Sequence, residues 1–193
     1  MMEPFRVLLA DPPWSFGDKL PGPSRGAEKN YAVLDIDAIR RFPLPPLADD
    51  ALLFLWRVSS QPEEALQVMR AWGFVPKSEI VWVKTTDAGD NLAFGMGRYV
   101  RLCHEVCLIG ARGRGAQLIR NRSIRSVFFA PRGEHSAKPD SFYTLIEQLA
   151  EGPYAELFAR RPRVGWTQWG NELPGGSAAP ISRTFVDSCS SSE

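Results

Sequence analysis

The tetrapeptide Asp11-Pro12-Pro13-Trp14, which directly follows the apolar run Phe5–Ala10, constrains the fold of this chain more than any other feature. The apolar run predicts a buried strand of a parallel sheet. Two consecutive prolines end the strand and fix the backbone, because each proline sets φ and lacks an N–H. The Asp11 carboxylate and the Trp14 indole are therefore held at the carboxyl end of a strand, where open α/β sheets bind ligands. A carboxylate, backbone carbonyls and a flat ring together suit the amino group on the edge of a planar base.

The remainder of the chain predicts strands that alternate with helices, which favours an α/β fold with a mostly parallel sheet. A capping box with proline in the first turn, Ser60-Gln61-Pro62-Glu63, opens one helix, and Gly73 ends it. The expected further helices are 35–41 and 139–149, and the expected further strands are 51–56, 79–83, 106–109, 126–130, 154–158 and 165–169.

Length and composition favour one soluble domain. The chain has 193 residues, 44% of them hydrophobic, and a net charge of +1, so we expect a single domain over residues 1–173. The Gly-, Ser- and Ala-rich stretch 174–193 is expected to be a disordered tail. Neither a membrane span nor a signal peptide is visible. Three cysteines form no disulfide pattern and no structural zinc spacing, which favours a reducing, cytoplasmic setting with no metal.

Charge is unevenly distributed along the chain. The stretch 98–132 contains eight arginines, with Arg98 and Arg132 included. Glu105 is the only acid in this stretch. Arginines in such a run suit phosphate contacts with nucleic acid, although a charge run is also what a solvated face looks like. Arg98 and Arg101 are the two arginines of this run that we expect to bind substrate.

Four motifs in order give the chain a family resemblance. The tetrapeptide is followed by Phe54-Leu55-Trp56, by Ser136-Ala137-Lys138-Pro139-Asp140, and by Glu156-Leu157-Phe158-Ala159-Arg160 with Trp169-Gly170-Asn171-Glu172 after it. This set resembles the MT-A-type adenine methyltransferases, the family of the messenger-RNA adenosine methyltransferase catalytic subunit and of bacterial and phage enzymes. The resemblance extends over roughly residues 5–173. It implies a Rossmann-like, S-adenosylmethionine-dependent fold in permuted order, with the catalytic strand before the cofactor strand. The absence of a Gly-x-Gly-x-x-Gly fingerprint near the N-terminus agrees with it.

The resemblance also implies a cofactor site. Lys138 precedes a helix, where a cation opposes the helix dipole unless an anion is bound there, and in the family this lysine meets the carboxylate of S-adenosylmethionine. Glu156 suits ribose hydroxyls. The family positions around the ribose and adenine are occupied here by Arg160, Asn171 and Glu172, although messenger-RNA members carry Gln in place of Glu172. The expected product is S-adenosylhomocysteine.

Catalysis is assigned to the tetrapeptide, Asp11, Pro12, Pro13 and Trp14. Hydrogen bonds from the adenine amine to Asp11 and to the Pro12 carbonyl would orient the nitrogen and stabilise its developing positive charge. Asp11 also counts as a cofactor contact because the methyl donor lies beside it, and Trp14 is expected to stack on the base. Further substrate contacts are expected from Tyr31 and Glu105, by family position, and from Trp56, whose alternative is core packing.

We therefore predict methyl transfer from S-adenosylmethionine to the exocyclic amino group of adenine in DNA, because compact bacterial and phage relatives resemble the chain more than a messenger-RNA complex subunit does. Two alternatives stay open: an RNA adenosine methyltransferase, and a catalytically silent nucleic-acid-binding subunit. A duplex target must be flipped out of the stack. Recognition then falls to the loops 15–30 and 85–125, with a second subunit in a homodimer or heterodimer as a further source.

Overall fold

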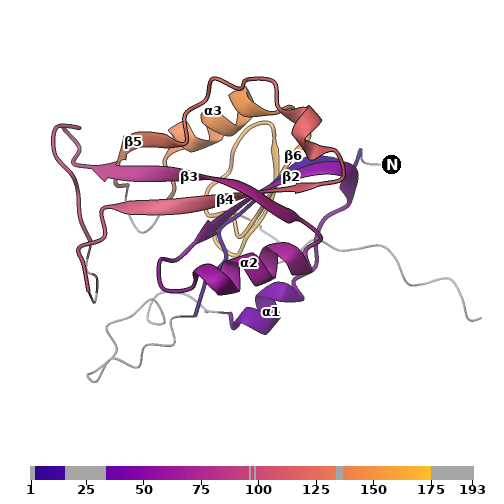
Figure 1. The fold of residues 1–193 in the computed structure, drawn as a ribbon, viewed down its shortest axis with the longest axis horizontal. Helices are drawn as coiled ribbons and strands as arrows, with labels where there is room; N and C mark the ends of the chain where they lie inside the picture. Colours follow the sequence, from indigo (N-terminus) through magenta and orange to yellow (C-terminus); the bar gives the residue numbers. More distant parts are fainter. Residues whose placement is uncertain (1–2, 16–33, 96, 98, 134–136, 175–193) are drawn as a thin grey trace, which may run out of the picture.

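A computed structural model places seven strands in one mixed sheet with helices on both faces (Figure 1). The structure describes residues 3–15, 34–95, 97, 99–133 and 137–174. The elements follow one another as β1 Phe5–Ala10, α1 Ile36–Arg40, β2 Leu47–Arg57, α2 Pro62–Ala71, β3 Val75–Thr85, β4 His104–Arg112, the short 3-10 helix η2 Gly115–Leu118, β5 Val127–Pro131, α3 Asp140–Leu149, β6 Tyr154–Leu157 and β7 Trp166–Trp169. The predicted α/β class and mostly parallel sheet are confirmed. In the described part of the chain, no helix is long and apolar enough to cross a bilayer.

The strand order is β5-β3-β4-β2-β1-β6-β7, with β1 near the middle. Strands β2 and β6 flank β1, and both run parallel to it. The chain leaves β1 towards β2 by way of α1, and much later reaches β6 by way of α3 on the other face (Figure 1). Connections that depart to opposite sides create a switch point, which is where doubly wound sheets open a crevice for ligands.

Strand β4 is antiparallel to both β2 and β3. The sequence did not predict this reversal, because a short apolar run gives no strand direction. The consequence for the site is direct: the amino end of β4 lies at the same sheet edge as the carboxyl ends of β1, β2 and β3. Residues that begin β4 therefore join those that end its neighbours.

The core lies on both faces of the sheet, as alternation along the strands requires. Leu8 and Ala10 of β1 pack towards α1 and α2, whereas Val7 and Leu9 pack towards α3. Each face forms one apolar cluster, so the central strands are buried on both sides and read as continuous hydrophobic runs.

The start of α2 corrects one sequence prediction. Gln61 is the N-cap and makes no side-chain capping bond, and Pro62 begins the helix. The prediction of a capping box that begins at Ser60 is therefore wrong. Proline fits the first helical position because its missing N–H would have no helical partner there, and this leaves the cap to the residue just before it. The Gln61 side chain instead donates to the Ser15 carbonyl at 2.8 Å. The end of α2 is as predicted, with Gly73 at φ +83°.

Candidate active site

The tetrapeptide that follows β1 is held in place from two sides. The Trp14 indole N–H donates to the carbonyl of Trp56 at the end of β2 (3.1 Å). The Leu34 N–H donates to the Pro13 carbonyl (2.9 Å), and the Trp14 N–H donates to the Pro12 carbonyl (2.9 Å). Trp14 is only 5% exposed, so it anchors the loop in the core of the free protein. Stacking of Trp14 on a base stays a prediction.

Four charged side chains meet at the sheet edge beside this loop. Lys138 Nζ lies 2.6 Å from Asp11 Oδ2 and 3.2 Å from Glu105 Oε2. Lys84, at the end of β3, lies 2.6 Å from Glu105 Oε1. The order Lys84–Glu105–Lys138–Asp11 thus alternates in sign and sums to zero. Within the described ranges no group of three His, Cys, Asp or Glu side chains could hold a metal ion, and these two carboxylates have lysines as partners.

The ion pairs between Lys138 and its two carboxylates are largely shielded from solvent. The exposed fraction of the Lys138 side chain is 9%, and that of Asp11 is 18%. Burial alone would lower the pKa of Lys138, but Asp11 and Glu105 outweigh it and raise that pKa above its usual value. Burial alone would raise the pKa of Glu105, but Lys138 and Lys84 hold it below its usual value. Lys138 is therefore a permanent cation near neutral pH, and Glu105 is a permanent anion.

Trp56 belongs to the core of the free protein. Its ring is 1% exposed and packs against Phe142, with ring centroids 4.6 Å apart. The Lys138 ammonium lies 5.1 Å from the centroid of the Trp56 ring, within the range of a cation–π interaction. The indole N–H of Trp56 is buried without a hydrogen-bond partner in the described part of the chain. An unsatisfied donor of this kind is costly unless water or a ligand accepts from it.

Glu156, near the end of β6, is almost fully buried. Both of its carboxylate oxygens accept hydrogen bonds. The Tyr143 hydroxyl donates to Oε1 (2.8 Å) and the Gln168 side-chain amide donates to Oε2 (2.6 Å). Burial raises the pKa of Glu156 to about 7, although these two hydrogen bonds act in the opposite direction. Burial and the nearby Glu156 carboxylate also raise the pKa of Tyr143, so the phenol stays protonated and remains a donor.

The pKa of Glu156 predicts a pH-dependent stability. The folded-state pKa of about 7 lies above the ordinary value of 4.5, so the folded protein binds more protons than the unfolded chain in this interval. Stability is then fully present below about pH 4.5 and is lost as pH rises through about 7, by up to roughly 3 kcal/mol. We expect Glu156→Gln to remove this decline, measured as the difference between wild-type and variant free energies of unfolding at pH 5 and pH 8. Parallel pH profiles for the two proteins would contradict the assignment.

The segment after β7 is pressed against the segment after β6. A Cβ at Gly170 would lie 1.9 Å from the Ala159 carbonyl oxygen, so only glycine fits there. This approach accompanies a contact between Glu172 and Arg160, whose guanidinium Nε lies 3.8 Å from a Glu172 oxygen. Phe158, between Glu156 and Arg160, has φ +62°, a conformation that non-glycine residues rarely adopt outside turns and functional sites.

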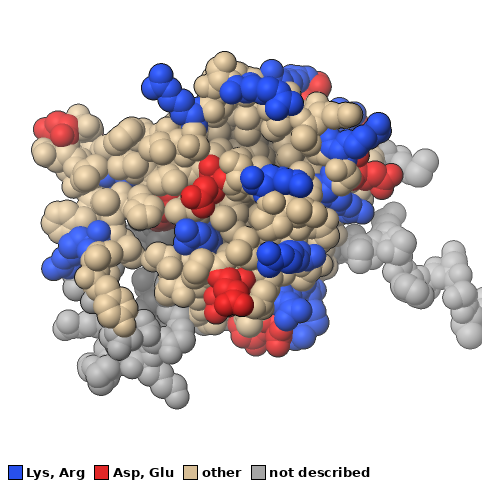
Figure 2. All heavy atoms as spheres, viewed as in Figure 1, with Lys and Arg blue, Asp and Glu red and all other residues tan. Residues whose placement is uncertain are grey.

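The predicted arginine surface is divided. Arg101 lies in the loop between β3 and β4, at the edge that carries Asp11, whereas Arg112 ends β4 at the far edge and Arg114 follows it. Arg114 pairs with Asp50 (3.3 Å), and Arg120 pairs with Glu151. On the face shown in Figure 2, basic residues are separated by acidic and uncharged ones. Among the residues that the structure describes, the arginines of this run therefore lie at opposite edges of the sheet and do not form one continuous basic patch. Two other predicted substrate contacts, Tyr31 and Arg98, lie outside the described residues.

Sequence reasoning missed three polar residues of this site. Lys84 directly follows the predicted apolar strand 79–83. A lysine at that position is a candidate partner for the Glu105 carboxylate. Tyr143 lies one turn after Asp140 on the buried face of α3. Gln168 is held by the Arg163 N–H (2.6 Å) and in turn donates to Glu156 and to the Arg161 carbonyl. Each is a polar residue close in sequence to large apolar residues, which is the signal that could have found them.

Comparison with known proteins identifies the family of this chain. The MT-A70 family model matches residues 5–172. The chain is 34% identical over 175 residues to the human N(6)-adenosine-methyltransferase catalytic subunit METTL3. These residues cover 89% of this chain and 28% of METTL3. It is 33% identical over 175 residues to an MT-A70-like protein of Drosophila melanogaster, again over 89% of this chain and 27% of the relative.

A further relative is similar in extent as well as in sequence. The type II methyltransferase M.MunI of a Mycoplasma species is 29% identical over 192 residues, which cover 88% of this chain and 78% of M.MunI. The chain thus spans about 28% of the length of METTL3 and most of M.MunI. The match over residues 5–172, which includes the tetrapeptide, the Lys138 motif and the Glu156 strand, shows that the chain belongs to the MT-A70 family, a family of adenine N6-methyltransferases.

Proposed function

We propose that this protein transfers the methyl group of S-adenosylmethionine to the exocyclic amino group of adenine in DNA. The observation that carries the proposal is the cluster in which Lys138, 127 positions away in sequence, bonds to Asp11 Oδ2 at 2.6 Å. It joins the residue predicted to face the adenine amine to the residue predicted to face the cofactor. Methyl transfer requires the bound adenine and the bound methyl donor to be in contact.

The residues present fit S-adenosylmethionine. Its methionine part carries one carboxylate and one ammonium group, and the cluster offers both signs of charge in a buried place. Lys138 and the first N–H groups of α3 would hold the carboxylate, as helix N-termini do for anions. Glu156 would accept from the ribose hydroxyls, and Arg160, Asn171 and Glu172 would surround the ribose and adenine. The cofactor supplies an electrophilic methyl group on a positively charged sulfur.

Asp11 would act on the adenine amine. Its Oδ2 is bonded to Lys138, which leaves Oδ1 to accept a hydrogen bond from the amine. The Pro12 carbonyl already accepts from the Trp14 N–H, but a carbonyl oxygen has a second lone pair for the other amine hydrogen. Both acceptors would stabilise the positive charge that develops on the nitrogen as its bond to the methyl carbon forms and the bond from that carbon to the cofactor sulfur breaks, leaving a neutral thioether. The amine proton then leaves towards Asp11 and solvent, so a stronger base is not needed.

DNA and RNA each have one observation in their favour. The match to a type II methyltransferase over 78% of that enzyme's length favours DNA as the substrate. The higher identity with METTL3, 34%, and its designation as an adenosine methyltransferase favour RNA. A duplex target of either kind would have to release the adenine from pairing, because its amino group is otherwise engaged.

The test is methyl transfer from isotope-labelled S-adenosylmethionine to matched DNA and RNA strands, followed by mass spectrometry of the nucleosides. We expect N6-methyldeoxyadenosine from the DNA. Product from RNA alone would replace DNA with RNA as substrate. The absence of both product and cofactor binding, with nucleic acid still bound, would move the protein to the class of silent nucleic-acid-binding subunits. Cofactor binding without any product would reject transfer to these strands by this chain alone.

A further inference from the structure

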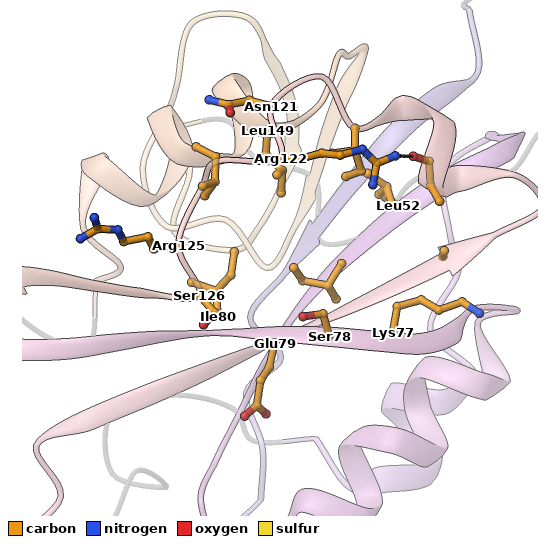
Figure 3. A pocket seen from close by; sticks show the side chains of 15 residues that line it. Leu52, Lys77, Ser78, Glu79, Ile80, Asn121, Arg122, Arg125, Ser126 and Leu149 are labelled. Carbon is orange, nitrogen blue, oxygen red and sulfur yellow. Dashed lines mark hydrogen bonds between the residues drawn. The ribbon is translucent and has the colours of Figure 1, made fainter.

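A cavity of about 300 Å³ lies between the sheet and the segment that connects η2 to β5 (Figure 3). None of its lining residues belongs to the charge cluster of Lys84, Glu105, Lys138 and Asp11. It opens on the α3 side of the sheet, over the first half of β3 and the second half of β4. The proposed methyl transfer gives it no role.

The inner wall of the cavity is apolar. It is formed by Leu52 and Ile109 of the central strands, Ile80 of β3, Ile124 of the connecting segment and Leu149 at the end of α3. Leu52, Ile80 and Leu149 are buried, so the cavity reaches into the core. A dry apolar cavity of about half this volume accommodates benzene. The space found here therefore suits a hydrocarbon body of about two rings, whose contacts would replace those that the lining side chains lack.

The mouth of the cavity is basic. Lys77, Arg122 and Arg125 line it, and none of the three forms an ion pair with any residue that the structure describes. Arg122 extends across the mouth and makes one long hydrogen bond, 3.5 Å, to the Ala116 carbonyl (Figure 3). The acid in the lining, Glu79, points to the other side of β3 (Figure 3). The guanidinium of Arg122 thus keeps most of its donors available for an anion.

We propose that this cavity binds a small apolar acid: a compact hydrocarbon body of about two rings with one carboxylate. The body occupies the pocket lined by Leu52, Ile80 and Leu149, and the carboxylate meets Arg122 at the mouth. Ligand sites combine these two features, a mostly apolar lining and a few polar groups that fix orientation. The site is separate from the proposed cofactor site, so a ligand here and S-adenosylmethionine should bind together.

The probe is 1-naphthoate, and its neutral analogue 1-naphthalenemethanol is the chemical control. Calorimetry or ligand-observed NMR on the full chain should show one site, with the acid binding roughly tenfold more tightly than the alcohol. Ala116→Trp, at an exposed position on the rim, should weaken 1-naphthoate by at least about tenfold. Ala71→Trp, on the far face of the sheet, is the matched control and should leave the affinity unchanged.

A second pair of variants separates charge from shape. Arg122→Gln should remove most of the preference for the acid over the alcohol, whereas Arg70→Gln on α2 should keep it, and thermal melts verify that every variant folds. Saturating S-adenosylmethionine should not displace 1-naphthoate. The proposal is overturned by no binding at millimolar probe, by equal affinity for acid and alcohol, by undiminished binding to Ala116→Trp, or by displacement with S-adenosylmethionine.

Discussion

Asp11→Asn is expected to lower the rate of methyl transfer by roughly 10²- to 10³-fold, the loss that follows removal of one group that stabilises transition-state charge. The affinity for S-adenosylmethionine should change much less, because Lys138 keeps Glu105 as a partner at 3.2 Å. Single-turnover rates with bound substrate, together with cofactor affinities from calorimetry, measure the two effects separately. Near-normal turnover would reject Asp11 as the catalytic carboxylate.

Glu105→Gln is the matched control for this variant. It also removes one carboxylate from Lys138, but it leaves Asp11 and its 2.6 Å bond to the lysine in place. If Asp11 acts on the adenine amine, Asp11→Asn should be far slower than Glu105→Gln at saturating substrate. Equal losses in the two variants would mean that Asp11 works through the position of Lys138 rather than on the substrate.

The sequence was sufficient for the order and type of the main elements. The apolar run before Asp11, the run that ends at Trp56 and the stretch after Gly165 each form strands as predicted. These strands lie in the middle of the sheet or carry bulky buried residues, so their local patterns agree with their tertiary environment. At the start of α2, the capping-box pattern favoured a start after Ser60, whereas Pro62 favoured a start at the proline itself. The fixed backbone of the proline determined where the helix begins.

The sequence was insufficient for the partners within the site. Asp11 and Lys138 are separated by 127 positions, and their contact depends on α3 and β1 meeting at one edge. Glu105 reaches the same edge only because β4 is antiparallel, a reversal that its apolar pattern does not encode. The unusual pKa of Glu156 likewise follows from burial beside Tyr143 and Gln168, and burial depth is a property of the assembled sheet. Residue types could thus be assigned to roles, but their pairing required the fold.

Lys138→Met is expected to weaken S-adenosylmethionine binding by roughly 10- to 100-fold, since a hydrogen bond to a charged group contributes about 1.5–3 kcal/mol. Methionine keeps an unbranched apolar stem of similar length but loses the charge and, with it, the cation–π interaction with the Trp56 ring. Calorimetric titration of the cofactor measures this loss. The surface variant Lys77→Met, at the mouth of the separate cavity, controls for a general effect of charge. An unchanged affinity in Lys138→Met would remove this lysine from the cofactor site.

The same variant should also destabilise the fold, by roughly 3 kcal/mol at neutral pH, because it leaves two partly buried carboxylates facing each other. Lys138 and Lys84 hold the pKa of Glu105 below its ordinary value, so this group stabilises the protein above about pH 4.5, and the benefit is lost as pH falls. Without Lys138 the pKa of Glu105 is lowered less, and the stability of the variant should approach that of the wild type on acidification.

Adding Asp11→Asn to Lys138→Met removes one of the two facing carboxylates and should recover part of the loss at neutral pH. A coupling energy of roughly 1–3 kcal/mol between the two substitutions is expected from denaturant unfolding, whereas strict additivity would mean that the Lys138–Asp11 contact contributes nothing to the folded state in solution.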